Sequence, residues 1–112
     1  MVNRPKIRGT AWETQIVHAL KRAGWFHAER RALQGGLDKG DIAGVIGVCI
    51  EAKDCKSITL GPWLKELQAE TVNSGAEIGA VWAKRRGFTQ PEDGYVVMDG
   101  ATFLKLLKSA GY

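Results

Sequence analysis

Alternating apolar and polar residues predict an extended strand in the middle of the chain. Apolar residues occupy every second position of the segment 48–53 and therefore share one face of the strand. Glu51 and Lys53 share the other face, where two opposite charges lie two residues apart. A second short apolar segment, 41–45, precedes this strand, and the glycines between the two segments predict a hairpin.

The register of this hairpin follows from the length of its loop. If the loop has three residues, its last residue is Gly47, which supplies the left-handed conformation that such loops require. Ile42 then lies opposite Ile50 on the apolar face. In the same register Asp41 lies opposite Glu51. A loop one residue shorter or longer would turn the Asp41 side chain to the wrong face, so the apolar pair and the carboxylate pair select the same register.

Helical and strand-like patterns alternate along the rest of the chain. A helix is expected over residues 10–23, because apolar residues recur there with helical spacing and Gly24 follows. The segment 1–9 before it is expected to be a basic, mobile arm. The other expected elements are a strand at 25–31, a glycine-containing loop at 32–40, a helix at 62–73, strands at 78–83 and 95–98, and a last helix that Asp99 caps and that ends near Ser109. This order predicts a single α/β domain with a mixed sheet.

Composition restricts the classes of function. The chain has 112 residues, of which 45% are apolar and 25% are charged, as in one folded domain. Its net charge of +4 favours an anionic partner. It has no segment long enough to cross a membrane and no signal peptide, and its two cysteines form no disulfide framework, so we expect an intracellular, cytoplasmic protein. No zinc-ligand spacing and no phosphate-binding glycine loop occur, so a structural zinc and a nucleotide cofactor are not expected.

Three charged residues of the hairpin carry the candidate chemistry. Asp41 and Glu51 offer hard oxygen ligands that suit magnesium or manganese, and Lys53 lies beside them. Such an ion polarises a phosphoryl oxygen and helps to generate hydroxide. The Ala52 carbonyl is a further candidate ligand, and Asp38 is a rival ligand in the preceding loop. The alternative is that these charges only keep an exposed face soluble and that Asp41 is a turn residue.

Glu13 is the fourth candidate. On the helical wheel it lies between Val17 and Leu20 and not on the polar face, which is unusual for a solvated glutamate. The alternative is a capping box, in which the Glu13 side chain bonds back to the Thr10 amide. The carboxylates of the hairpin favour a functional role.

Glu13, Asp41 and the run Glu51-Ala52-Lys53 resemble the signature of the PD-(D/E)XK nuclease superfamily, in the same order of helices and strands. Gly40 replaces the proline that often precedes the aspartate of this motif. Within the superfamily, the small basic domain is similar to the archaeal-type and phage-encoded Holliday junction resolvases. The resemblance covers approximately residues 9–86 and implies a restriction-endonuclease-like fold, in which helices flank a mixed central sheet.

The resemblance also implies magnesium-dependent hydrolysis of DNA phosphodiesters, with manganese as a substitute ion. By analogy Asp41 and Glu51 bind the metal together with the Ala52 carbonyl. Glu13 assists the metal or its water, and Lys53 orients or deprotonates the attacking water. The expected enzyme is a structure-selective endonuclease that resolves four-way DNA junctions as a homodimer. Alternatives are another nicking, repair or restriction-like nuclease, a non-catalytic DNA-binding module of the same fold, and an α/β protein without a role in nucleic-acid chemistry.

Basic residues near these positions are candidate DNA contacts, although each could equally be a solvated surface charge. They lie at strand ends, in loops and in the N-terminal arm: Arg30, Arg31, Lys39, Lys84, Arg85, Arg86, Arg4, Lys6 and Arg8. Related nucleases often carry a polar residue on the helix that follows the lysine. Among the polar residues of that helix, Gln68 is the candidate accessory residue in preference to Glu66 and Glu70.

Overall fold

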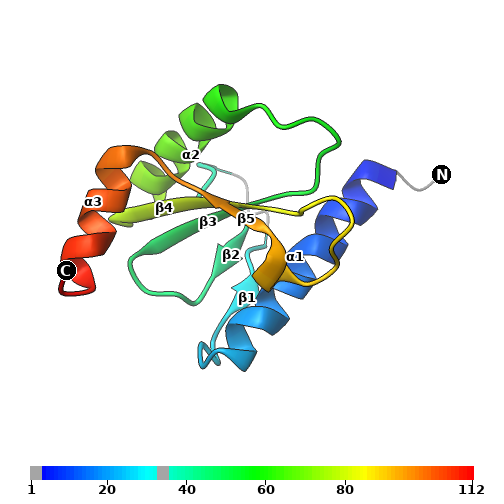
Figure 1. Cartoon of the computed structure of the whole chain (residues 1–112), viewed down its shortest axis with the longest axis horizontal. Helices are drawn as coiled ribbons and strands as arrows, with labels where there is room; N and C mark the ends of the chain where they lie inside the picture. Colours follow the sequence, from blue (N-terminus) through cyan, green and yellow to red (C-terminus); the bar gives the residue numbers. More distant parts are fainter. Residues whose placement is uncertain (1–3, 33–35) are drawn as a thin grey trace.

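The helices and strands lie in one α/β domain, shown in Figure 1. The structure is a computed structural model that describes residues 4–32 and 36–112, with side chains from residue 9 onward. The elements are α1 (Arg4–Arg22), β1 (Glu29–Arg30), β2 (Ile42–Ala43), β3 (Val48–Lys53), α2 (Leu60–Ser74), β4 (Ile78–Ala83), the 3-10 turn η1 (Pro91–Asp93), β5 (Tyr95–Val97) and α3 (Gly100–Ser109).

The five strands form one mixed sheet in the order β1-β2-β3-β4-β5. β3 and β4 run parallel, and the other neighbouring strands run antiparallel. α1 crosses one face of the sheet, and α2 covers the other face with α3 beside it (Figure 1). The prediction of a small α/β domain with a mixed sheet is therefore confirmed. Within the described ranges, no helix has the length and apolar character needed to cross a membrane.

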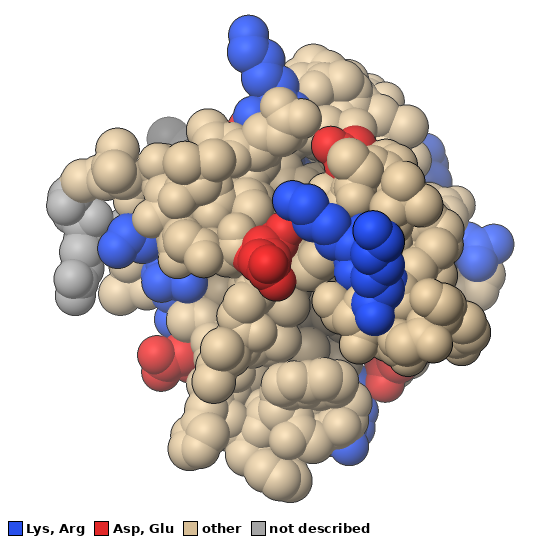
Figure 2. All heavy atoms as spheres, turned by 90° about the vertical axis from the view of Figure 1, so that its left-hand side faces the viewer, with Lys and Arg blue, Asp and Glu red and all other residues tan. Residues whose placement is uncertain are grey.

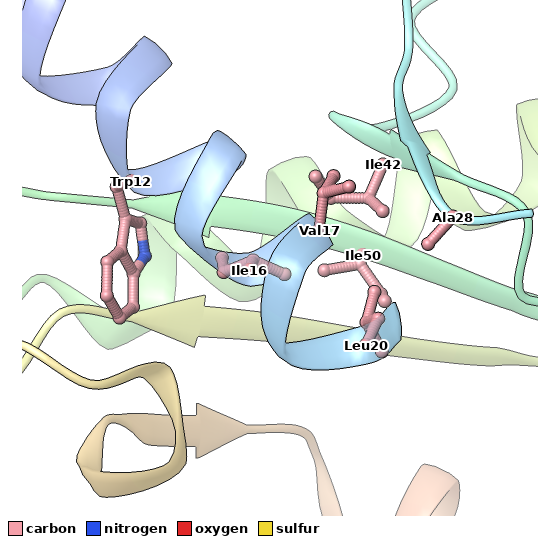
Figure 3. Packing of buried hydrophobic residues seen from close by; sticks show 7 residues of the cluster. All are labelled: Trp12, Ile16, Val17, Leu20, Ala28, Ile42 and Ile50. Atoms are coloured by element: carbon pink, nitrogen blue, oxygen red, sulfur yellow. The ribbon is translucent and has the colours of Figure 1, made fainter. Parts of the chain in front are cut away.

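Each face of the sheet carries its own apolar core. The core under α1 consists of Trp12, Ile16, Val17, Leu20, Ala28, Ile42 and Ile50 (Figure 3). The core under α2 consists of Cys49, Trp63, Leu67, Val81 and Ala83. Because side chains alternate along a strand, β3 contributes to both cores in turn. The expected single buried face of β3 is thus too simple, since helices cover both faces.

The predicted hairpin register is confirmed at its apolar pair. Ile42 pairs with Ile50, and the Val48 N–H donates to the Val45 carbonyl at 3.1 Å, which closes a tight turn over Ile46 and Gly47. Gly47 has the expected left-handed conformation, with a φ of 80°. The loop therefore fixes which side chains of β3 face α1 and which face α2.

The N-terminal third differs from the expectation. α1 begins at Arg4 and not at Thr10, because Pro5 lies in the first turn, where its missing N–H costs no helical hydrogen bond. The expected mobile arm is therefore wrong for residues 4–9, while residues 1–3 lie outside the described residues. The side chains of the basic residues before Gly9, Arg8 included, also lie outside the described residues.

The strand expected at 25–31 is shortened to the two residues of β1. The chain keeps turning after α1, since the Trp25 N–H donates to the Leu20 carbonyl at 2.9 Å and the Ala28 N–H donates to the Trp25 carbonyl at 3.2 Å. These turns leave only Glu29 and Arg30 to pair with β2. The remaining predicted elements match within a few residues, and the Asp99 side chain caps α3 by accepting from the Thr102 N–H at 2.8 Å.

Candidate active site and metal centre

The side chain of Glu51 is buried against α2. Glu51 alternates with Ile50 along β3, so it points away from the α1 core and exposes only 6% of its surface. Its Oε2 atom is buried and has no hydrogen-bond partner among the described residues. A charged carboxylate in such a place is strongly disfavoured unless it binds a proton or a cation.

A second buried carboxyl group faces Glu51 from α2. Glu70 exposes 1% of its surface, and neither of its carboxylate oxygens has a partner within the described part of the chain. Burial raises the pKa of Glu70 to about 7, with further raising by Glu66 and Asp38 and an opposing contribution from Glu51. Burial also raises the pKa of Glu51, and the carboxyl groups of Glu70 and Asp41 raise it further. The pair therefore favours a bound proton or a metal ion over two bare charges.

Four carboxyl groups converge at this point. Asp38, Glu51, Glu66 and Glu70 each offer one oxygen, and these four oxygens lie within 4.8 Å of one another. They come from three elements: the loop before β2, strand β3 and two successive turns of α2. A set of hard oxygen ligands fits a divalent cation such as Mg²⁺ or Mn²⁺. The unpartnered oxygens of Glu51 and Glu70 are the feature that distinguishes this cluster from acidic groups gathered at a surface.

Lys53 adds a positive charge beside the cluster. Its Nζ atom lies 3.2 Å from Oε1 of Glu66 and 4.0 Å from Oε1 of Glu51. Burial lowers the pKa of Lys53, but the carboxylates of Glu66 and Glu51 more than offset this effect and the net pKa is raised. Without a metal ion in the cluster, Lys53 is therefore held as an ammonium ion by these two carboxylates.

The Asp41 carboxyl group lies beside that of Glu51, as the predicted register requires. The Asp41 N–H donates to the Ile50 carbonyl at 2.9 Å, and its Oδ2 atom accepts from the Ala52 N–H at 2.8 Å. Its oxygens are not among the four that converge. Asp38, the rival ligand in the sequence, contributes instead. Asp41 fixes the backbone of β3 next to Glu51, and its charge still raises the Glu51 pKa.

Glu13 lies on the other side of Asp41. Since α1 begins at Arg4, Glu13 is inside the helix, and the capping box with Thr10 is wrong. The Glu13 side chain is 17% exposed, and its Oε1 atom lies 3.7 Å from Nε of Arg30. Burial and then Asp41 raise the pKa of Glu13, while Arg30 lowers it. Glu13, Arg30 and Asp41 line a cavity of about 520 Å³ that Asp38 also borders, so Glu13 is near the cluster and not within it.

Gln68 is not part of the cluster. It is exposed on the flank of α2 that faces α3, where it lines a cavity of about 220 Å³ with Asp99 and Thr102. Glu66 and Glu70 are the residues of α2 that reach the site. The sequence carried a signal for Glu70, which lies about 20° from Trp63 on the helical wheel and therefore within the apolar stripe. Gln68 lies about 140° from Trp63, on the flank of the helix.

The predicted DNA contacts separate into two groups. Arg30, Arg31 and Lys39 surround the cavity beside Glu13, where Arg30 is already paired with that carboxylate. Lys84, Arg85 and Arg86 lie in the loop after β4, where they line a separate groove. The structure thus brings basic residues to both sides of the site.

Comparisons with protein-family models, with curated proteins and with solved structures found no match for this chain. The carboxylate cluster, Lys53 and the charged surfaces around them are therefore the features from which a function can be inferred.

Proposed function

We propose that this chain is a metal-dependent, structure-selective DNA endonuclease of the PD-(D/E)XK type that resolves four-way junctions by paired cuts. The observation that carries the proposal is the buried pair of Glu51 and Glu70, whose unpartnered oxygens converge with two further carboxylates beside the Lys53 ammonium. A site that binds only structural cations has no need of such an ammonium group. A restriction-endonuclease-like arrangement of the mixed sheet is part of this proposal.

The residues of the cluster fit a magnesium or manganese ion. Asp38, Glu51 and Glu70 would hold it, and Glu66 would join them on release from Lys53. Such an ion supplies a water of lowered pKa and polarises a phosphoryl oxygen. The set differs from the ligands implied by the resemblance, because α2 contributes two carboxylates and Asp41 none.

The other charged residues act on the substrate or position the site. The Lys53 ammonium stabilises the negative charge that develops on the phosphorus oxygens as water adds. Asp41 holds the Ala52 amide and thereby fixes the strand that carries both Glu51 and Lys53. Glu13 holds Arg30 at the edge of the neighbouring cavity, where that guanidinium can meet a phosphate.

The surface of α3 supports the homodimer that paired cuts require. None of its residues is buried, and Phe103, Leu104 and Leu106 expose between 38% and 61% of their surfaces. Figure 2 shows the end of the molecule that holds α3 and the C-terminus, where uncharged areas surround a central group of adjoining basic and acidic side chains. A second copy that covers this face would create two related sites, which suits symmetric cuts in a two-fold junction.

The test is cleavage of a labelled four-way junction and of a matched linear duplex, first with Mg²⁺ and then with EDTA. Glu51→Gln and Lys53→Ala are measured beside wild type. Glu77→Gln and Lys21→Ala, at exposed positions away from the cluster, are the matched controls. We expect symmetric nicks in the junction that disappear with EDTA and fall by about 10³-fold in the two site variants, a typical loss when a transition-state contact is removed.

Other outcomes separate the alternatives. Equal cutting of the duplex would keep the nuclease and remove the preference for junctions. Metal-independent DNA binding without cleavage, unchanged in Glu51→Gln, would identify a non-catalytic module. Absence of DNA binding at low salt would overturn a nucleic-acid role altogether.

A further inference from the structure

A basic groove adjoins the candidate site at the ends of the two parallel strands. β3 and β4 end side by side, and the Lys84 N–H donates to the Lys53 carbonyl at 2.8 Å. The loops that follow these strands enclose a groove of about 410 Å³, lined by residues 54–56 and 84–88. In Figure 1 both loops lie at the end of the sheet near the start of α1, opposite the end that holds α3.

The groove has an excess of positive charge. Its lining contains four cationic side chains and one carboxylate: Lys56, Lys84, Arg85, Arg86 and Asp54. Within the described part of the chain, none of the four cations forms an ion pair within 4.0 Å. An anionic partner can therefore enter the groove without displacing a carboxylate of the protein.

The aromatic ring of Phe88 lines the same groove, and the ring of Tyr95 lies next to Arg85 of its lining. The Arg85 guanidinium lies 4.1 Å from the centre of the Phe88 ring and 5.6 Å from that of Tyr95. These contacts hold Arg85 in place through cation–π attraction. Phe88 and Tyr95 nevertheless remain 39% and 43% exposed, so part of each ring is accessible to a ligand. Sites for single-stranded nucleic acid typically combine cations that bind the phosphate backbone with aromatic rings on which the bases stack.

We propose that this groove binds an unpaired strand of nucleic acid, with its phosphates on Lys56 and Arg86 and an unstacked base against Phe88. The groove begins where Lys53 ends β3, so a strand bound in it lies next to the carboxylate cluster. This inference rests on the proposed nuclease in one respect, since the same strand would continue from the groove to the carboxylate cluster. An acidic peptide would use the cations but would leave the aromatic rings without a partner.

The test measures binding without metal or cleavage, so that it is independent of nuclease activity. A short labelled DNA single strand and its duplex are titrated in EDTA by fluorescence anisotropy, with Phe88→Ala, Phe88→Leu and Arg86→Gln. Phe26→Ala and Lys21→Gln, at exposed positions away from the groove and from α3, are the matched controls. Phe88 is partly exposed, and Phe88→Leu keeps apolar bulk while it removes the ring, so both Phe88 variants are expected to fold. A thermal midpoint near that of wild type checks the folding of each variant.

We expect both Phe88 variants to weaken binding of the single strand about tenfold and to leave duplex binding unchanged, since stacking on an aromatic ring contributes an energy of this order. We expect Arg86→Gln to weaken the binding of both the single strand and the duplex. It should also reduce the slope of log affinity against log salt concentration by about one, the value for one lost phosphate contact. Equal effects of Phe88→Ala on the two ligands, or none, would overturn the inference. So would displacement of the single strand by poly-glutamate at equal charge concentration, which would identify a surface for acidic proteins.

The outcomes for the groove and for the nuclease are separable. If the Phe88 variants selectively lose single-strand binding and the wild-type protein cuts no junction with Mg²⁺, the groove is supported and the nuclease proposal is overturned. Metal-dependent cutting that is intact in the Phe88 variants, with unchanged single-strand affinity, would keep the nuclease and remove the groove.

Discussion

The two faces of strand β3 bury side chains to nearly the same depth, but with opposite consequences for stability. Ile50 exposes 4% of its surface toward α1, and Glu51 exposes 6% toward α2. Ile50 packs among apolar groups, and its burial stabilises the fold. Glu51 meets the carboxyl group of Glu70, and its burial lowers stability unless a proton or a cation is bound. The buried carboxyl pair on the α2 face therefore costs stability in the absence of a bound cation, which is consistent with the metal site proposed above.

Substitutions on the two faces are therefore expected to change stability in opposite directions. Ile50→Ala should lower the free energy of unfolding by about 2–5 kcal/mol, because it leaves a cavity in the α1 core. Glu70→Gln should raise it by up to about 3 kcal/mol at pH 8 in EDTA, because the neutral amide avoids the cost of ionising a buried carboxyl group whose pKa is raised to about 7. Urea denaturation followed by circular dichroism measures both changes.

Two controls keep this comparison interpretable. Ile50→Val, with an expected loss of about 0.5–1.5 kcal/mol, replaces Ile50→Ala if that variant does not fold. Glu77→Gln removes an exposed carboxylate and should change stability little. A clear loss of stability in Glu70→Gln would mean that Glu70 contributes to the fold, and the contrast between the two faces would not hold.

The stability of the metal-free protein should decrease as pH rises. The pKa of Glu70 is raised from 4.5 to about 7 in the folded state, so the folded state binds this proton more tightly than the unfolded state. This proton therefore stabilises the folded protein fully below pH 4.5, and the stabilisation is lost as pH rises through 7. At 1.36 kcal/mol per pKa unit, the free energy lost is on the order of 3 kcal/mol. Thermal midpoints between pH 5 and 8 in EDTA measure this loss, and Glu70→Gln should flatten it. A midpoint that rises over this range would contradict the buried acid pair.

Magnesium should reverse this loss at high pH. A ligand that binds only the folded state at 100 times its dissociation constant stabilises it by about 2.7 kcal/mol. Binding requires ionised carboxylates, so the gain should be larger at pH 8 than at pH 5. Thermal midpoints with and without Mg²⁺, for wild type and Glu51→Gln, provide the measurement. Equal gains in the two proteins would place the ion elsewhere.

The same two faces show what could be predicted from the sequence. The hairpin was predictable because the apolar alternation of β3 and the conformation of Gly47 are local properties. The start of α1 was missed because Pro5 looked like a break in a basic arm, although proline is compatible with a first helical turn.

The carboxylate cluster was only partly predictable. Glu51 and Lys53 were identified from β3 alone, and their proximity is confirmed by the 4.0 Å contact. The contribution of α2 depends on how that helix packs across the sheet, which local pattern does not determine. Glu70 within the apolar stripe was the available signal, but Gln68 was preferred by analogy. Asp41 lies beside Glu51 as predicted, while Asp38 is the aspartate among the four converging oxygens. The Asp41 side chain accepts the Ala52 N–H, a contact that the strand pairing alone does not reveal.

The smallest effect is expected at Glu66, which separates the exposed edge of the cluster from its buried centre. Its side chain is 45% exposed and its contact with Lys53 is open to water, so Glu66→Gln should change the free energy of unfolding by less than about 1 kcal/mol. Its effect on Mg²⁺ affinity should also be smaller than that of Glu70→Gln, because Lys53 already occupies the Glu66 carboxylate. Isothermal titration with Mg²⁺ at pH 8 compares the two variants. A larger loss in Glu66→Gln would shift the centre of the metal site toward the surface and would make the buried pair a secondary feature.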